Sequence, residues 1–419
     1  MSLEQSDDLG ATLVGPMLDV TLDADLAGLI APVGAGRSAD RASVLPQVID
    51  EGGALRLARS EGPRYAPVRL LGRGGMGEVD LAEDRDIGRA VAIKRLIPQD
   101  RNAGAIARFA EEVRTIGRLE HPNVLPIHDV GVDADGRYFF VMKYLEGETL
   151  EAIITRLRAG DPATQARYDV ARRVEIFLGV LRALEFAHAH GILHRDIKPA
   201  NVMVGAHGEV VLMDWGVAGP VRRGGAAPAF DPEATVPTTA EDGRLWTTRI
   251  GDLVGTPQYM SPEQALGHND TLDERSDLYA ACVLLHELLG LVHRHAEHKT
   301  LMAVLMAVHR TEAPSAHTLV AAGPAPREGI PAPYAHLLHR GLQRDPAQRW
   351  QSASELIAEV EAIQRGEARV QCPVTLAHRI VASVQHFLDR RHGLAAAAVF
   401  GVLLVSAASV IATVVRLLT

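Results

Sequence analysis

The sequence predicts an α+β fold with two unequal lobes, a small β-rich lobe followed by a large helical lobe, and one C-terminal transmembrane helix. Three observations lead to this prediction. Short apolar runs joined by turn residues, at 79–93 and 202–213, are typical of β-hairpins. Apolar side chains at helical spacing occupy 106–119, and an apolar helical stretch follows residue 277. Residues 394–415 carry no charged side chain.

Length, charge and cysteine usage limit the class of protein. A length of 419 residues allows one two-lobed domain with tails, and a net charge of −9 gives no indication of nucleic-acid binding. Two cysteines are too few for a disulfide framework and suit a reducing cytosol. Four histidines that are close in sequence are interpreted as a surface or helix-end cluster rather than a metal site: His286, His293, His295 and His298.

The first hairpin is preceded by the run L-G-R-G-G-M-G-E-V at 71–79. Its glycines have G-x-G-x-x-G spacing, which lets backbone approach phosphates closely but also occurs in ordinary turns and in dinucleotide-binding units. A strand follows the loop, whereas a helix would follow it in a dinucleotide-binding unit. We therefore predict nucleotide contacts from Leu71, Gly72, Arg73, Gly74, Gly75, Met76, Gly77 and Val79.

Lys94 ends the next predicted strand, in the run V-A-I-K. Alone, such a lysine is typical of a solvated strand end, but beneath a glycine loop its ammonium reaches the α- and β-phosphates of a nucleotide. A lysine in this role needs a carboxylate to hold it. The predicted helix over 106–119 carries Glu111 and Glu112, and the phase of its apolar face allows either to point inward.

Residues 194–201, H-R-D-I-K-P-A-N, place a carboxylate, a lysine and an amide at fixed offsets. Phosphoryl transfer needs a carboxylate that receives and orients the attacking hydroxyl, positive charge near the phosphoryl oxygens, and an oxygen ligand for a metal. Asp196, Lys198 and Asn201 supply these in that order. We therefore expect Asp196 and Lys198 to be catalytic.

Asp214 ends a second predicted hairpin, whose strands are 202–204 and 209–213. Magnesium takes only one or two protein oxygens and otherwise keeps waters and phosphate oxygens. Asn201 and Asp214 flank the paired strand ends, and we predict that they bind Mg²⁺. If Asp214 only terminated a strand, Asn201 would have no partner with which to share a metal.

With these motifs the chain resembles a bacterial serine/threonine protein kinase of the eukaryotic-like (Hanks) type. The resemblance runs from Tyr65 to Ile363 and includes S-P-E at 261–263 where the family has A-P-E, R-S-D-L-Y-A at 275–280, and R-D-P-A-Q-R-W at 344–350. It implies a two-lobed protein kinase fold over 63–365, the use of ATP and Mg²⁺, and protein substrates.

The resemblance also implies roles for individual residues. The second glutamate of the pair, Glu112, holds Lys94. Met142 is the gatekeeper of the adenine pocket, Lys143 and Leu145 offer backbone groups to adenine, and Ala92 is a further nucleotide contact.

On the substrate side, the resemblance implies that Glu263 and Arg349 form a buried ion pair and that Asp277 anchors the catalytic loop from below. Lys198, together with Thr256 in G-T-P-Q-Y, resembles the serine/threonine pattern more than the tyrosine pattern, so the substrate hydroxyls are aliphatic.

Kinases with an arginine at the position of Arg195 commonly need a phosphate on the activation segment. Thr247 and Thr248 are the candidates for autophosphorylation, although threonines in a polar loop are often only solvated. The Gly-, Ala-, Pro- and Thr-rich insert at 219–242 is expected to be mobile unless phosphorylated or bound.

Three positions depart from the family pattern without removing a phosphate or metal ligand. Trp215 replaces the usual phenylalanine after Asp214, where the ring packs against the helix that bears Glu112. Asp80 replaces an aromatic residue after the glycine loop, and Lys143 replaces an acidic residue of the hinge.

The two ends differ. Residues 1–62 lack periodicity and a secretory signal, and are expected to be a mostly disordered extension. Residues 394–415 are long enough to cross ~30 Å of hydrocarbon as a helix. Arginines at 379, 390 and 391 lie before this segment, so the kinase domain is predicted to be cytoplasmic, with 366–393 as juxtamembrane linker and 416–419 as extracytoplasmic tail.

These observations lead to a membrane-tethered, single-pass serine/threonine protein kinase of the cell membrane that uses ATP and Mg²⁺. Its control is expected to come from a partner, from self-association or from the activation loop. Two alternatives remain: a nucleotide-sensing scaffold or pseudokinase, which the intact catalytic residues disfavour, and a small-molecule phosphotransferase, which the segment around Thr256 disfavours.

Overall fold

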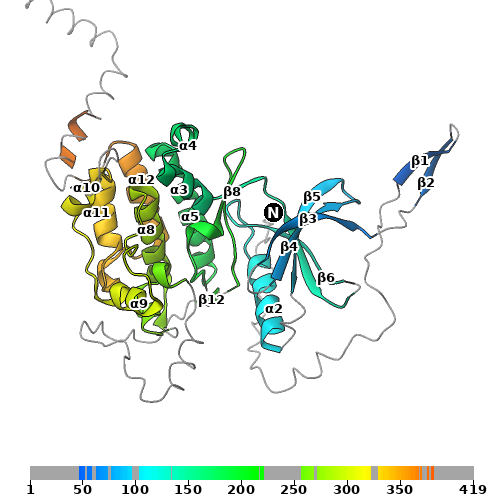
Figure 1. Cartoon of the computed structure of the whole chain (residues 1–419), viewed down its shortest axis with the longest axis horizontal. Helices are drawn as coiled ribbons and strands as arrows, with labels where there is room; N and C mark the ends of the chain where they lie inside the picture. The colour runs from blue at the N-terminus through cyan, green and yellow to red at the C-terminus, as the bar shows by residue number, and fades with distance from the viewer. Residues whose placement is uncertain are drawn as a thin grey trace, which may run out of the picture.

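The computed structural model describes two lobes, small and large, that meet near the middle of the view in Figure 1. It describes residues 47–51, 54–58, 63–73, 77–96, 103–133, 135–216, 218–220, 256–268, 271–321, 329–367, 369, 375–376 and 379–381. The lobes have the β-rich and helical characters that the sequence predicts. The insert beyond Pro220, both candidate phosphorylation threonines and the predicted transmembrane segment lie outside the described residues.

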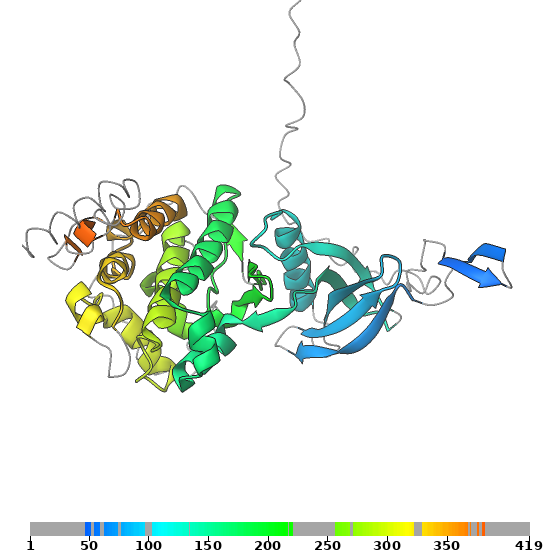
Figure 2. The same ribbon diagram turned by 90° about the horizontal axis from the view of Figure 1, so that it is seen from above.

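The small lobe is a five-stranded antiparallel sheet with the order β3-β4-β5-β7-β6. Its strands are β3 Tyr65–Arg73, β4 Gly77–Asp84, β5 Arg89–Leu96, β6 Ile127–Val132 and β7 Tyr138–Lys143. Helix α2, Ala103–Gly117, lies beside the sheet (Figure 2) and buries Phe109 against Phe140, with ring centroids 5.4 Å apart. The predicted first hairpin and the predicted helix are confirmed.

A buried ionic cluster ties the start of this lobe to its sheet. Asp84, which is fully buried, accepts two hydrogen bonds of 2.9 Å from Arg64. Burial alone would raise the pKa of Asp84, but Arg64 outweighs burial and the pKa is lowered. The neighbouring Tyr65 hydroxyl donates to Asp129 on β6.

N-terminal to the small lobe, strands β1 Gln47–Glu51 and β2 Ala54–Ala58 form an antiparallel hairpin.

The large lobe is helical, and most of its helices begin at a residue whose side chain accepts a backbone N–H of the first turn. Thr149, Asp169, Asp273 and Ser352 cap α3, α5, α8 and α12 in this way. The helices are α3 Leu150–Ala159, α4 Pro162–Arg167, α5 Val170–Ala189, α7 Pro262–Ala265, α8 Glu274–Gly290, α9 Leu301–Arg310, α10 Ala316–Ala321, α11 Ala332–Gly341 and α12 Ala353–Gln364.

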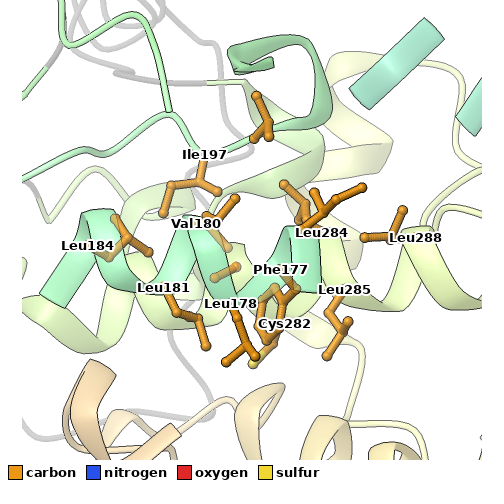
Figure 3. Close-up of a cluster of buried hydrophobic side chains, with 14 of the residues drawn as sticks. Phe177, Leu178, Val180, Leu181, Leu184, Ile197, Cys282, Leu284, Leu285 and Leu288 are labelled. Carbon is orange, nitrogen blue, oxygen red and sulfur yellow. The ribbon is translucent and has the colours of Figure 1, made fainter. Parts of the chain in front are cut away.

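Helices α5 and α8 form the centre of the core (Figure 3). Phe177 and Val180 of α5 lie close to Leu284 and Cys282 of α8, and all four are fully buried. Cys282 is a core residue, as predicted, and burial raises the pKa of its thiol to about 12. Ile197, between the two predicted catalytic residues, is also fully buried in this core and anchors their loop.

A small sheet lies on the large lobe at the junction of the lobes. Strands β8 Gly147–Thr149, β10 Val202–Gly205 and β11 Val210–Leu212 have the order β11-β10-β8. The β10–β11 hairpin is the second predicted one. A separate pair joins β9 Ile192–Leu193 to β12 Gly219–Pro220.

Within the described residues, no helix is both long enough and apolar enough to span a membrane. Residues 394–415 and nearly all of the predicted linker lie outside that part of the chain.

The histidine cluster lies at the C-terminal end of α8, which is one of the two placements predicted, but two of its members are not on the surface. His293 and His295 are buried, with 7% and 1% of their surface exposed. The His293 ring lies edge-on to Tyr259, with centroids 4.9 Å apart. Burial, with a smaller contribution from Arg294, lowers the pKa of His295 to about 3 and that of His286 to about 4. Among the described residues, no group of three or more histidine, cysteine, aspartate or glutamate side chains is placed to hold a metal ion.

These buried imidazoles are expected to make the large lobe sensitive to acid. Their folded-state pKa values lie below the ordinary value of 6.5, so below pH 6.5 the unfolded chain binds protons that the folded chain does not. The free energy of unfolding should fall between pH 6.5 and 4, by on the order of 2–3 kcal/mol from His295. His295→Gln should flatten this dependence in urea titrations, and His317→Gln, at an exposed position on α10, should not. An equal slope in the two variants would contradict the prediction.

Candidate active site

A cavity of about 490 Å³ lies between the lobes. Its lining combines charged side chains from both lobes with apolar side chains from the sheet and from α2. The lining residues are Gly77, Val79, Lys94, Glu112, Ile116, Leu125, Ile127, Phe140, Met142, Asp196, Lys198, Asn201, Met213, Asp214, Trp215 and Thr256. Convergent polar groups in an otherwise apolar pocket are typical of a ligand site.

Lys94 and Glu112 form an ion pair across the back of the cavity, with 2.5 Å between Nζ and Oε1. Glu112 is 3% exposed on the inner face of α2, while Glu111 is exposed, so the structure confirms the second glutamate as the partner. Burial raises the pKa of Glu112, Lys94 opposes this, and Asp214 adds to it. Lys94 Nζ also lies 4.0 Å from Asp214 Oδ1, so one ammonium faces two carboxylates.

Asp277, at the start of α8, holds the catalytic loop in place. Its buried carboxylate accepts hydrogen bonds from the backbone N–H groups of His194 (2.8 Å) and Arg195 (2.9 Å), and from Nε2 of His188 (2.9 Å). Arg195 has a φ of 66°, in the left-handed region that non-glycine residues seldom adopt. The predicted anchoring role of Asp277 is confirmed.

Asp196 is surrounded by donors. Oδ1 accepts from the backbone N–H and the hydroxyl of Thr256, both at 2.7 Å, and Oδ2 accepts from Lys198 Nζ at 2.7 Å. Burial alone would raise its pKa, but the hydrogen bonds from Lys198 and Thr256 outweigh burial and lower it. Asp196 is therefore held as a carboxylate, which can accept a hydrogen bond from a hydroxyl group and orient it.

Asn201 and Asp214 face the same part of the cavity. The Asn201 amide nitrogen donates to the Asp196 carbonyl oxygen at 2.8 Å, which leaves its side-chain oxygen as the acceptor. Asp214 has a φ of 62°, and 51% of its side chain is exposed. An amide oxygen and an accessible carboxylate suit a hard divalent cation that keeps most of its own waters.

The glycine loop ends at Gly77, where strand β4 begins. A Cβ on Gly77 would lie 2.5 Å from the carbonyl oxygen of Arg95, so β4 and β5 approach too closely there for any side chain. Gly72, at the end of β3, has open space around it. Gly74, Gly75 and Met76 lie outside the described residues.

The structure brings most predicted site residues together, since nine of them are in the lining. Of the others that it describes, Ala92 and Leu145 are buried next to the cavity without lining it. Leu71, Gly72 and Arg73 also lie outside the lining. Sequence reasoning did not assign these lining residues to the site: Ile116, Leu125, Ile127, Phe140, Met213, Trp215 and Thr256.

Beneath the site, Arg349 makes two hydrogen bonds, of 2.8 and 2.9 Å, to the Glu263 carboxylate. Burial opposes ionisation, but Arg349 outweighs it and lowers the pKa of Glu263 to about 2. The predicted buried ion pair is confirmed. At the outer face of the small lobe, Asp80 forms an ion pair with Arg95 on the adjacent strand, which accounts for an acid in place of an aromatic residue.

Comparison with known proteins gives one consistent family. The profile of the protein kinase domain matches residues 65–360. The chain is 32% identical over 317 residues to serine/threonine-protein kinase PknD of Protochlamydia amoebophila, and 36% identical over 308 residues to PknD of Mycobacterium tuberculosis. It is 33% identical over 313 residues to a probable serine/threonine-protein kinase of Streptomyces coelicolor. These matches cover 72–74% of this chain but only 31–41% of those proteins.

Gly77 has no room for a side chain and Gly72 has open space around it, and this difference tests whether the cavity binds a nucleotide. Gly77→Ala forces β4 away from β5 and should weaken binding of a fluorescent ATP analogue by roughly tenfold or more, since overpacking costs about 1–3 kcal/mol. Gly72→Ala, where a Cβ meets nothing within 4 Å, should bind within about twofold of the wild type. Fluorescence titration measures both, and thermal denaturation verifies that each variant is folded. Equal losses in the two variants would contradict the assignment.

Proposed function

This chain belongs to the protein kinase family, and we propose that it is a serine/threonine protein kinase that transfers the γ-phosphoryl group of ATP to hydroxyl groups of proteins. One observation carries the proposal. The Asp196 carboxylate lies at the junction of the lobes, hydrogen-bonded to Lys198 and Thr256 and within the same cavity as Lys94 and Asp214.

Asp196 receives the substrate hydroxyl in this mechanism. A serine or threonine hydroxyl that replaces Thr256 at Oδ1 is oriented for in-line attack, and its proton passes to Asp196 as the oxygen–phosphorus bond forms and the bond to the ADP leaving oxygen breaks. Lys198, already 2.7 Å from Oδ2, supplies positive charge to the transferring phosphoryl oxygens.

The nucleotide phosphates are held by the small lobe and by a metal. Lys94, fixed by Glu112, pairs with the α- and β-phosphates, and the backbone at Gly77 approaches them without a side chain between. Asn201 and Asp214 would hold Mg²⁺, which would supply positive charge to neutralise the nucleotide phosphates. Met142 and the apolar lining receive the adenine ring.

The protein substrates and the regulation belong to the same proposal. The serine/threonine kinase names of the relatives and the contact between Lys198 and Thr256 (2.8 Å) both favour aliphatic hydroxyls. The Arg195 guanidinium lies against Gly219, where a Cβ would be 2.3 Å from it. A phosphate on Thr247 or Thr248, reaching Arg195, would order the activation segment.

Phosphate transfer tests this function directly. The full chain with γ-labelled ATP and Mg²⁺ should label itself and a generic protein substrate on serine and threonine. Asp196→Asn should reduce labelling by about 10²–10⁴-fold, the usual contribution of a general base. Mapping the modified residues shows whether Thr247 or Thr248 is among them. Nucleotide binding without any transfer would instead support the nucleotide-sensing scaffold.

The membrane anchor is the second part of the proposal. Residues 394–415 form an uncharged segment of membrane-spanning length, and arginines at 379, 390 and 391 precede it. This arrangement favours a single-pass protein whose kinase domain faces the cytoplasm, where ATP is available.

Alkaline carbonate extraction of membranes tests the anchor. The full chain should remain in the membrane pellet, and a variant that ends at Arg391 should be in the soluble fraction, because it lacks the uncharged segment. Protease added to the cytoplasmic side should digest the kinase domain. Release of the full chain by carbonate would show that residues 394–415 do not span the bilayer.

A further inference from the structure

Trp215 makes a hydrogen bond that a phenylalanine in its place could not make. Its indole ring is 1% exposed, and Nε1–H donates to the carbonyl oxygen of Leu212 at 3.3 Å. The bond reaches back three residues and encloses Met213 and Asp214 in a closed turn. This turn carries the carboxylate that we assign to the metal.

The backbone of the turn is in an uncommon conformation. Asp214 has a φ of 62°, and a non-glycine residue in the left-handed region costs of order 1 kcal/mol or more unless its surroundings hold it. The entry to the turn is fixed, because Leu212 N–H donates to Asn123 and Met213 N–H donates to Asn201, both at 2.8 Å. Beyond Asp214, the Trp215 carbonyl accepts from Ala218 N–H at 3.0 Å. The indole bond joins the two sides of Asp214 directly.

His194 connects the same indole to the catalytic loop. The two rings meet edge-on, with centroids 4.6 Å apart. The Asp196 N–H donates to His194 Nδ1 at 3.2 Å, which leaves Nε2 as the donor to the Met213 carbonyl oxygen at 3.0 Å. The indole therefore packs against His194, and His194 connects the turn that carries Asp214 to Asp196.

We propose that the Trp215 indole N–H is a positioning group that keeps the Asp214 carboxylate turned into the cavity before any metal or nucleotide binds. That Asp214 is a metal ligand rests on the proposed function. That the indole hydrogen bond stabilises the turn around Asp214 does not. Loss of this N–H enlarges the population in which the turn opens, by about five- to tenfold for a net hydrogen bond of ordinary strength.

The sharpest variant keeps the shape of the ring and removes only the donor. Trp215→β-(3-benzothienyl)alanine, introduced into the full chain, replaces the indole N–H by sulfur. Trp350 provides a matched control, because its buried indole also donates to a backbone carbonyl, that of Leu337 at 3.2 Å, in the large-lobe core. The same replacement at 350 removes a comparable bond far from the turn. Trp215→Phe is a second variant at the site.

Hydrogen exchange of the metal-free protein is the first measurement. Amides of residues 213–216 should exchange about five- to tenfold faster in the Trp215 variant, because exchange follows the open population. The control at Trp350 should leave these amides unchanged. An unchanged rate at 213–216, or an equal acceleration by the control, would overturn the proposal.

The magnesium dependence of phosphate transfer is the second measurement. At saturating ATP, the Mg²⁺ concentration for half-maximal rate should rise in the Trp215 variant by up to about five- to tenfold. The reason is that the apparent affinity for Mg²⁺ falls with the fraction of molecules whose turn is closed. The maximal rate should be largely recovered at high Mg²⁺. If the wild type transfers no phosphate, the proposed function fails while hydrogen exchange still decides the role of Trp215.

Discussion

The geometry of the active site depends on one buried carboxylate. Asp277 is 2% exposed in the core of the large lobe and accepts two successive backbone N–H groups, from His194 and Arg195, as well as the His188 imidazole. Burial alone would raise its pKa, but the charge-assisted bonds from His188 and the backbone lower it. The loop that carries Asp196 is thereby attached to a core helix. Asp277 therefore sets where Asp196 lies relative to the core of the large lobe.

Two further buried ion pairs follow the same rule, that a charge removed from water needs a partner with good hydrogen-bond geometry. Arg349 and Glu263 pair through two parallel hydrogen bonds and tie the segment after Thr256 to the base of the large lobe. Lys94 and Glu112 join α2 to the sheet, but less completely: the second oxygen of Glu112 has no hydrogen-bond partner, and burial raises its pKa. The Lys94–Glu112 pair is thus less completely satisfied than the Arg349–Glu263 pair.

The sequence was informative wherever polar residues act at short, fixed spacing. The catalytic loop, Lys94 with its hairpin, and Asp214 after the second hairpin were all predicted, because local backbone geometry alone places them. Contacts between distant segments were predicted only where the family resemblance implied them, as for Glu263 with Arg349 and for Asp277 with the catalytic loop. Thr256 was noted for the substrate class, but its bonds to Asp196 join residues sixty positions apart. The apolar lining, such as Phe140 and Ile127, has the same pattern as ordinary core, and His295 became buried only because of how the chain turns after α8.

Two residues of the proposed active site have a strained backbone conformation. Among the described residues, three non-glycine positions have positive φ: Arg195, Asp214 and Leu291. Leu291 ends α8, where a left-handed residue is the ordinary way to stop a helix. Arg195 directly precedes the proposed base, and Asp214 is itself the proposed metal ligand. Each such conformation costs of order 1–3 kcal/mol and persists only where the surroundings over-determine it. Asp277 does so for Arg195, and the bonds of Leu212, Met213 and Trp215 do so for Asp214. The two carboxylates that phosphoryl transfer requires are therefore oriented by the fold itself, before a substrate is present.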